Sequence, residues 1–161
     1  MTQASKHRIF HWLLGAAVLS LVAAIGFALM REYPSIDPQD KALVAAGQRI
    51  YGTHCGSCHG ANLEGQPNWR ERLPNGRLPA PPHDASGHTW HHPDAVLFGI
   101  VKEGLVPGKY APPQYESDMP AFGGILSDEE IRSVLAYIKS TWPKRELDYQ
   151  LQMDVSSREG R

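Results

Sequence analysis

Cysteine is scarce in this chain of 161 residues: the sequence has two, Cys55 and Cys58. No disulfide outside this pair is possible, and a four-cysteine zinc site is excluded because there is no second pair. Acidic residues are absent before Glu32, and the segment 9–30 contains no charged residue. The remainder of the sequence lacks the alternation of apolar and polar residues that is typical of β-strands. These absences exclude a disulfide-rich scaffold and favour an all-α fold.

The two cysteines belong to the motif Cys55-Gly-Ser-Cys58-His59, the C-x-x-C-H pattern typical of c-type haem attachment. At this spacing each thiol can form a thioether with one vinyl group of the porphyrin, and His59 can serve as the proximal iron ligand. A dithiol redox pair or an internal disulfide is the alternative. A thioredoxin-like motif requires a βαβ context, which the surrounding sequence does not predict. The pattern therefore predicts one covalently bound haem c.

The second iron ligand is sought among four methionines. Met1 and Met30 flank the apolar N-terminal segment, and Met153 lies in a polar tail after the last predicted helix. Met119 precedes Pro120, which disfavours helix at the methionine and leaves it in a loop. We therefore predict that Met119 binds the iron opposite His59. The alternative is that Met119 fills a gap in the core.

Three helices are predicted from apolar spacing and end signals. The first starts at Asp37-Pro38 and runs into the haem motif, the second spans about 93–104, and the third follows the capping box that starts at Ser127 and stops before Pro143. Gly47 in the middle of the first helix costs about 1 kcal/mol relative to alanine. A close helix crossing would explain it, with Tyr137 of the third helix as the neighbour.

From Asp37 to Trp142 the sequence resembles the class I c-type cytochromes. The resemblance rests on Gly47-Gln-Arg-Ile50-Tyr51 before the C-x-x-C-H motif, and on Met119-Pro120-x-Phe122 before the third helix. It implies an all-α domain at 37–143, with three main helices and long loops around one haem. Residues 144–161 then form a polar C-terminal tail. The resemblance also implies that a proline carbonyl accepts the Nδ1 proton of the proximal histidine, and Pro81 or Pro82 is the match.

The loop between the first two helices is rich in histidine: His83, His88, His91 and His92 surround Trp90. One interpretation is a second metal site, for copper or zinc. The other is a polar loop that packs on the edge of the haem. In that case the Trp90 indole, or Arg77, could donate a hydrogen bond to a haem propionate.

The N-terminal region predicts a membrane anchor. Residues 1–8 form a basic cytoplasmic start, and 9–30 would make a helix of about 33 Å, enough to cross a hydrocarbon core of ~30 Å. Residues 31–36 are a linker. By the positive-inside rule, the haem domain lies on the periplasmic side of a bacterial inner membrane. The alternative is a signal peptide cleaved after Val22-Ala23-Ala24, although the apolar segment is longer than usual for one.

These features predict a membrane-anchored electron carrier rather than an enzyme, since His59 and Met119 would together leave the iron no open position. The expected donor is a quinol-oxidising complex or dehydrogenase, and the expected acceptor is a terminal oxidase or similar complex. Nucleic acid is disfavoured as a partner because the chain from Glu32 onward carries 17 acidic residues against 13 lysines and arginines, a net negative charge. A fixed subunit of a larger oxidoreductase, a ligand-binding haem sensor or enzyme, and a metal-handling protein are the alternatives.

Overall fold

The computed structural model describes residues 12, 15, 18, 20, 21 and 36–159. The chain divides into two units, 1–35 and 36–161, and the account below concerns the second. The predicted anchor at 9–30 and the linker at 31–36 lie almost entirely outside the described residues. Among the residues that are described, no helix is both long enough and apolar enough to cross a membrane.

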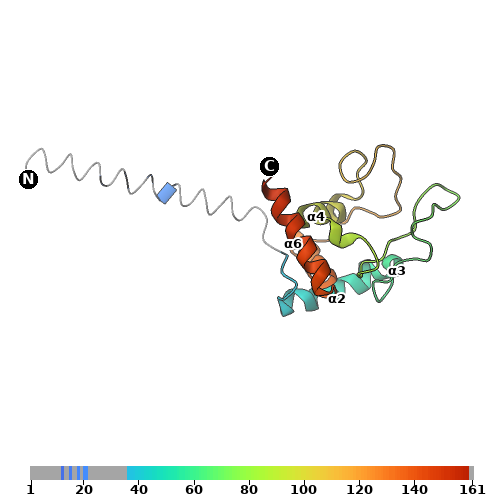
Figure 1. Ribbon diagram of the computed structural model, residues 1–161, viewed down its shortest axis with the longest axis horizontal. Helices are drawn as coiled ribbons and strands as arrows, with labels where there is room; N and C mark the ends of the chain where they lie inside the picture. The colour runs from blue at the N-terminus through green and yellow to red at the C-terminus, as the bar shows by residue number, and fades with distance from the viewer. Residues whose placement is uncertain (1–11, 13–14, 16–17, 19, 22–35, 160–161) are drawn as a thin grey trace, which may run out of the picture. The chain divides into compact units, whose positions relative to one another are not determined.

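Helices make up the regular structure of the region 36–159, which contains no strand. They are α2 (Lys41–His54), α3 (Gly56–His59), the 3₁₀ helix η1 (Thr89–His91), α4 (Asp94–Glu103), α5 (Asp128–Ser140) and α6 (Lys144–Glu159). Figure 1 shows these helices gathered together, with two long loops projecting beyond them. The predicted all-α class is confirmed, and α2, α4 and α5 are the three predicted main helices.

The start of α2 differs from the prediction. Asp40 rather than Asp37 caps the helix: its carboxylate accepts the backbone N–H groups of Ala42 and Leu43, at 2.9 and 3.1 Å. The carboxylate of Asp37 accepts the N–H of Gln39 at 2.8 Å and closes a turn before the helix. Asp37 and Asp40 can each accept free backbone N–H groups. Asp40 forms the cap because it directly precedes the first residue of α2.

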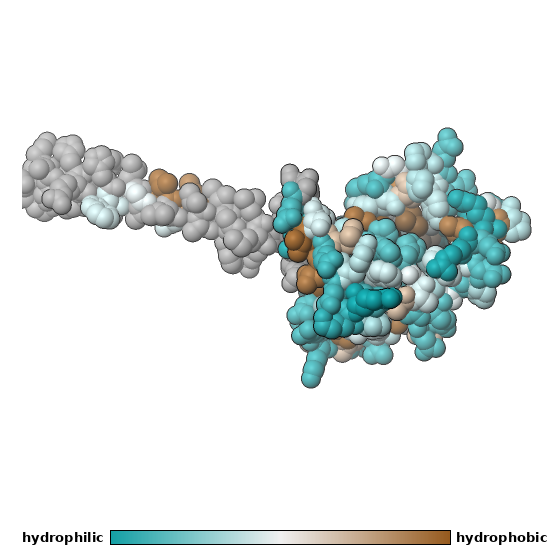
Figure 2. All heavy atoms as spheres, in the orientation of Figure 1, coloured by the Kyte–Doolittle hydropathy of each residue, from teal (hydrophilic) through white to brown (hydrophobic). Residues whose placement is uncertain are grey.

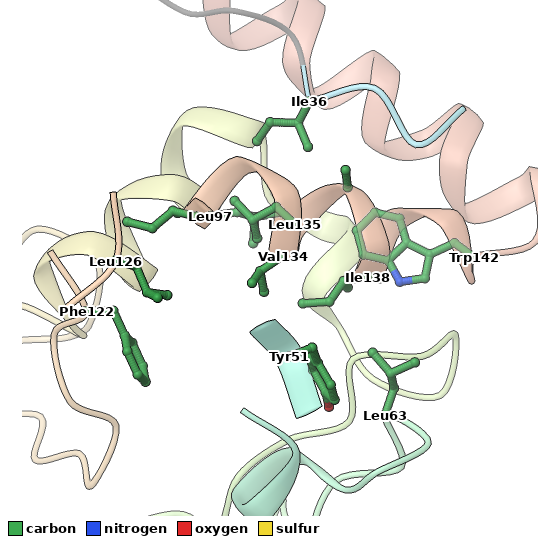
Figure 3. Close-up of a cluster of buried hydrophobic side chains, with 12 residues drawn as sticks. Ile36, Tyr51, Leu63, Leu97, Phe122, Leu126, Val134, Leu135, Ile138 and Trp142 are labelled. Carbon is green, nitrogen blue, oxygen red and sulfur yellow. The ribbon is translucent and has the colours of Figure 1, made fainter. Parts of the chain in front are cut away.

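The third predicted helix begins as expected. In α5 the Ser127 hydroxyl accepts the N–H of Glu130, and the Glu130 carboxylate accepts the N–H of Ser127 at 2.8 Å, which completes the capping box. The apolar stripe of α5 is fully buried and forms the centre of the core. Figure 3 shows Val134 and Ile138 extending from α5 toward Tyr51 of α2.

α2 and α5 cross at Gly47, as the sequence predicted. A Cβ atom built on Gly47 would overlap the backbone carbonyl of Ser133 and would lie 3.0 Å from the Cβ of Tyr137. The ring of Tyr137 packs at 5.4 Å from the ring of Tyr51, between ring centroids. Only glycine permits this approach of the two helix backbones, which offsets its low helix propensity.

The prediction of a polar tail at 144–161 is wrong, because α6 is a helix that packs on the domain. Its buried residues are polar: Gln150 and Asp154 are 2% and 7% exposed. Asp154 accepts the N–H of Asp94 at 2.6 Å, and so caps α4. Gln150 donates to the Asp94 carboxylate at 2.7 Å, and buried Lys139 of α5 pairs with the same carboxylate at 2.6 Å. Burial raises the pKa of Asp154. These polar contacts hold α6 on the domain, so the helix lacks the apolar stripe from which a packed helix is usually predicted.

The visible surface of the domain is mostly polar. Figure 2 shows a face that is mostly hydrophilic, with apolar side chains visible in small patches. Isolated apolar side chains are normal on a protein surface.

The crossing at Gly47 can be tested by whether an alanine there raises or lowers the stability of the fold. Helix propensity alone predicts that Gly→Ala stabilises α2 by about 1 kcal/mol at any position. We expect Gly47→Ala to destabilise the fold by about 1–3 kcal/mol instead, because the new methyl group must displace α5. The measurement is the midpoint of denaturant unfolding.

Gly52→Ala is the matched control, since a Cβ at Gly52 meets no atom within 4 Å. It should leave the unfolding midpoint unchanged or raise it. Equal midpoints for the two variants would show that the α2–α5 crossing tolerates a methyl group.

Candidate functional site

The C-x-x-C-H motif begins at the end of α2 and continues as the single turn α3. Cys55 ends α2, with its N–H donated to the Tyr51 carbonyl at 2.9 Å, and its own carbonyl accepts the N–H of His59 at 2.9 Å. Both thiols are free; Cys55 is partly buried and Cys58 is exposed. Burial, together with the neighbouring Cys58, raises the pKa of Cys55 to about 11. The helical turn therefore holds both thiols and the imidazole on one short segment.

His59 is buried, and its Nδ1 lies 2.8 Å from the carbonyl oxygen of Pro81. A carbonyl can only accept, so Nδ1 carries the proton and Nε2 keeps its lone pair. Burial lowers the pKa of His59, which favours the neutral ring. A neutral imidazole with a free Nε2 is the form that binds a metal ion. Of the two prolines named from the sequence, Pro81 supplies the carbonyl.

The Pro81 segment is fixed to the haem motif by backbone hydrogen bonds. The His59 carbonyl accepts the N–H of Gly65 at 2.8 Å, and the Leu63 carbonyl accepts the N–H of His83 at 2.8 Å. Gly65 has a φ of 70°, and a Cβ there would overlap the peptide between Pro81 and Pro82. The turn after His59 therefore lies against the segment that carries its acceptor.

Two side chains of the main helices complete this support. The Tyr51 hydroxyl donates to the Gly60 carbonyl at 2.9 Å, and the Trp142 indole N–H donates to the His83 carbonyl at 2.7 Å. Tyr51 belongs to α2, and Trp142 lies two residues after the end of α5. The helix crossing therefore positions both halves of the loop that holds His59.

A family model described as "Cytochrome c" matches residues 44–142. The chain belongs to the cytochrome c family. Neither the curated proteins nor the solved structures searched gave a match. Membership implies covalently bound haem c, and the spacing of Cys55 and Cys58 fits its attachment.

Trp90 supplies an independent observation that fits a bound group. Its indole Nε1 is buried and has no hydrogen-bond partner among the described residues. The indole packs against the core and contacts the rings of His91 and Tyr149, at centroid distances of 3.8 and 5.3 Å. Buried donors in native proteins are nearly always paired with a protein group, an ordered water molecule or a bound molecule, so this N–H has its acceptor outside the described residues. A haem propionate is one group that could accept it.

Met119 of the cytochrome lies in the loop before α5, partly buried against the same core as Cys55 and Trp90. Its N–H donates to the Ser117 hydroxyl at 3.0 Å, which turns the backbone at the methionine. Loop placement is as predicted.

Arg77 is tied to this methionine loop. It pairs with Asp118, and its Nε lies 3.4 Å from a carboxylate oxygen of Glu116. These carboxylates raise the pKa of Arg77. Arg77, which the sequence suggested as a donor to a propionate, has these two carboxylates as partners. The ion pair with Asp118 joins the loop after His59 to the residue before Met119.

The histidine loop does not form a metal centre in the region the structure describes, where no three histidine, cysteine or acidic side chains are grouped to hold an ion. The rings stack instead. His88 lies parallel to Trp69 at 5.5 Å, and His83 lies on His59 at 4.0 Å, between ring centroids. Burial lowers the pKa of His83 well below its usual value.

Sequence reasoning missed the contact of His83 with His59 and its partner Thr89. The position of His83 in the sequence could have indicated this contact, because His83 directly follows Pro81 and Pro82, the two candidates for the carbonyl that accepts from His59.

Attachment of the cofactor is directly testable. If Cys55 and Cys58 both form thioethers, extraction with acid and acetone will leave the haem on the polypeptide, and the pyridine derivative will show a c-type spectrum. Cys58→Ser should shift that spectrum toward a singly attached haem. Release of free haem from the intact wild-type protein would contradict covalent attachment.

Proposed function

We propose that this cytochrome is a one-electron carrier whose iron is held by His59 and Met119. The observation that carries the proposal is the hydrogen bond of 2.8 Å from His59 Nδ1 to Pro81, which leaves Nε2 free. When bound, haem c supplies an iron that takes up and releases a single electron. The family match supports electron transfer as the activity.

The protein residues would set the properties of that iron. The Pro81 carbonyl fixes the tautomer of His59 and makes its Nε2 a better donor. The Met119 thioether is a soft ligand that favours the reduced iron, and ligation by methionine and histidine gives a high potential.

We further propose the location and the partners. The uncharged segment 9–30 would anchor the cytochrome in a bacterial inner membrane, with the haem domain in the periplasm. An anchored domain would meet its partners at raised effective concentration. Those partners would be a quinol-oxidising complex or dehydrogenase as donor, and a terminal oxidase or similar complex as acceptor.

Ligation is tested by Met119→Ala. The oxidised variant should lose the sulfur-to-iron absorption band, and its reduction potential should fall because the thioether no longer favours reduced iron. Met153→Ala, in α6, is the matched control and should retain both. If Met119→Ala keeps the band and the potential, Met119 is core packing, and carbon monoxide binding by the wild type would favour the sensor alternative.

The anchor is tested by fractionation of cells that produce the full chain. A wash at high salt should leave the haem protein in the membranes, because apolar burial is not screened by ions. The intact mass should include the segment 9–30. Recovery from the soluble periplasm, with a mature chain starting near Ile25, would replace the anchor with a cleaved signal peptide.

A further inference from the structure

A second imidazole lies face to face with the proposed iron ligand. The ring centroids of His83 and His59 are 4.0 Å apart, and the ring planes differ by 22°. Both side chains are buried or partly buried. The stack adds to the hydrogen bond between His59 and Pro81, which restrains one edge of the same ring.

His83 is itself held in place on three sides. Its backbone N–H donates to the Leu63 carbonyl, and its carbonyl accepts the Trp142 indole N–H at 2.7 Å. Its ring Nδ1 lies 2.9 Å from the hydroxyl of Thr89, a buried residue of η1. The ring therefore presents a fixed flat surface to His59.

The His83 ring restricts a rotation of the His59 ring that its hydrogen bond to Pro81 does not prevent. A single hydrogen bond allows its donor ring to swing about the bond direction, since the angular preference at a carbonyl oxygen is broad. Such a swing would drive the His59 ring into the stacked His83 ring, which is already at van der Waals separation. Because the two ring faces are in contact, His83 also excludes water from that face of the His59 ring.

We propose that His83 is a positioning residue for electron transfer: fixed by Thr89, it sets the plane of the His59 imidazole and shields one face of that ring from water. The proposal rests on the proposed function, in which His59 is the iron ligand. In this proposal His83 is not a ligand of the iron. Its effect passes through the orientation and basicity of His59.

The test compares variants of the full-length holoprotein. The readouts are the electron paramagnetic resonance spectrum of the oxidised state, which reports ligand orientation, and the reduction potential. His83→Ala should broaden and shift the spectrum and lower the potential, because water then reaches the site. His83→Phe keeps a flat ring and should stay near wild type. Thr89→Val, which removes only the hydroxyl partner, should shift the spectrum as His83→Ala does, but less.

His88→Ala is the control, because His88 stacks on Trp69 rather than on His59. It should change neither readout. Wild-type spectra and potentials in both His83→Ala and Thr89→Val, even with lowered melting temperatures, would overturn the proposal and reduce His83 to core packing. A spectrum of His83→Phe as altered as that of His83→Ala would also overturn it. If His83→Ala does not fold, Thr89→Val decides.

Failure of this proposal can be told from failure of the proposed function. Absence of the sulfur-to-iron band from the wild type, or its persistence in Met119→Ala, would refute ligation of the iron by Met119. The His83 series refutes only the positioning role, because it compares proteins that all retain that band.

Discussion

The hydrogen bond between His59 Nδ1 and the Pro81 carbonyl is the constraint around which this domain is organised. It joins a helix-borne ring to a loop 22 residues later in the chain. A neutral imidazole can bind iron through Nε2 only if the proton resides on Nδ1, and the carbonyl of Pro81 enforces that choice. The loop hydrogen bonds from Gly65 and His83, and the indole of Trp142, all serve to keep that carbonyl in place.

The crossing of α2 and α5 is the rigid base of this arrangement. Gly47 lets the two backbones approach, so Tyr51 of α2 and Trp142 beyond α5 reach the same loop from two sides. A ligand held by packed helices and buried hydrogen bonds would move little when the bound iron changes oxidation state. That rigidity suits a protein whose task is to pass an electron without rearranging.

α6 extends the domain by a different physical means. Lys139, Asp94, Gln150 and Asp154 form a largely buried network in which each carboxylate accepts hydrogen bonds, and Asp154 satisfies the free N–H at the start of α4. Breaking one partner of such a network leaves a buried charge unpaired, which is strongly unfavourable. The helix is therefore specified by polar complementarity rather than by an apolar stripe.

The sequence by itself determined the features that depend on neighbours along the chain. The C-x-x-C-H motif, the capping box at Ser127 and the glycine at the α2–α5 crossing could all be predicted, because local geometry and helical spacing dictate them. Tertiary structure decided the rest. Only the folded structure shows that the carbonyl of Pro81 rather than Pro82 accepts from His59, that Arg77 pairs with Asp118, and that the ring of His83 stacks on His59. It also buried the polar face of α6, since the N–H of Asp94, which helps to make burial of Asp154 tolerable, lies on α4.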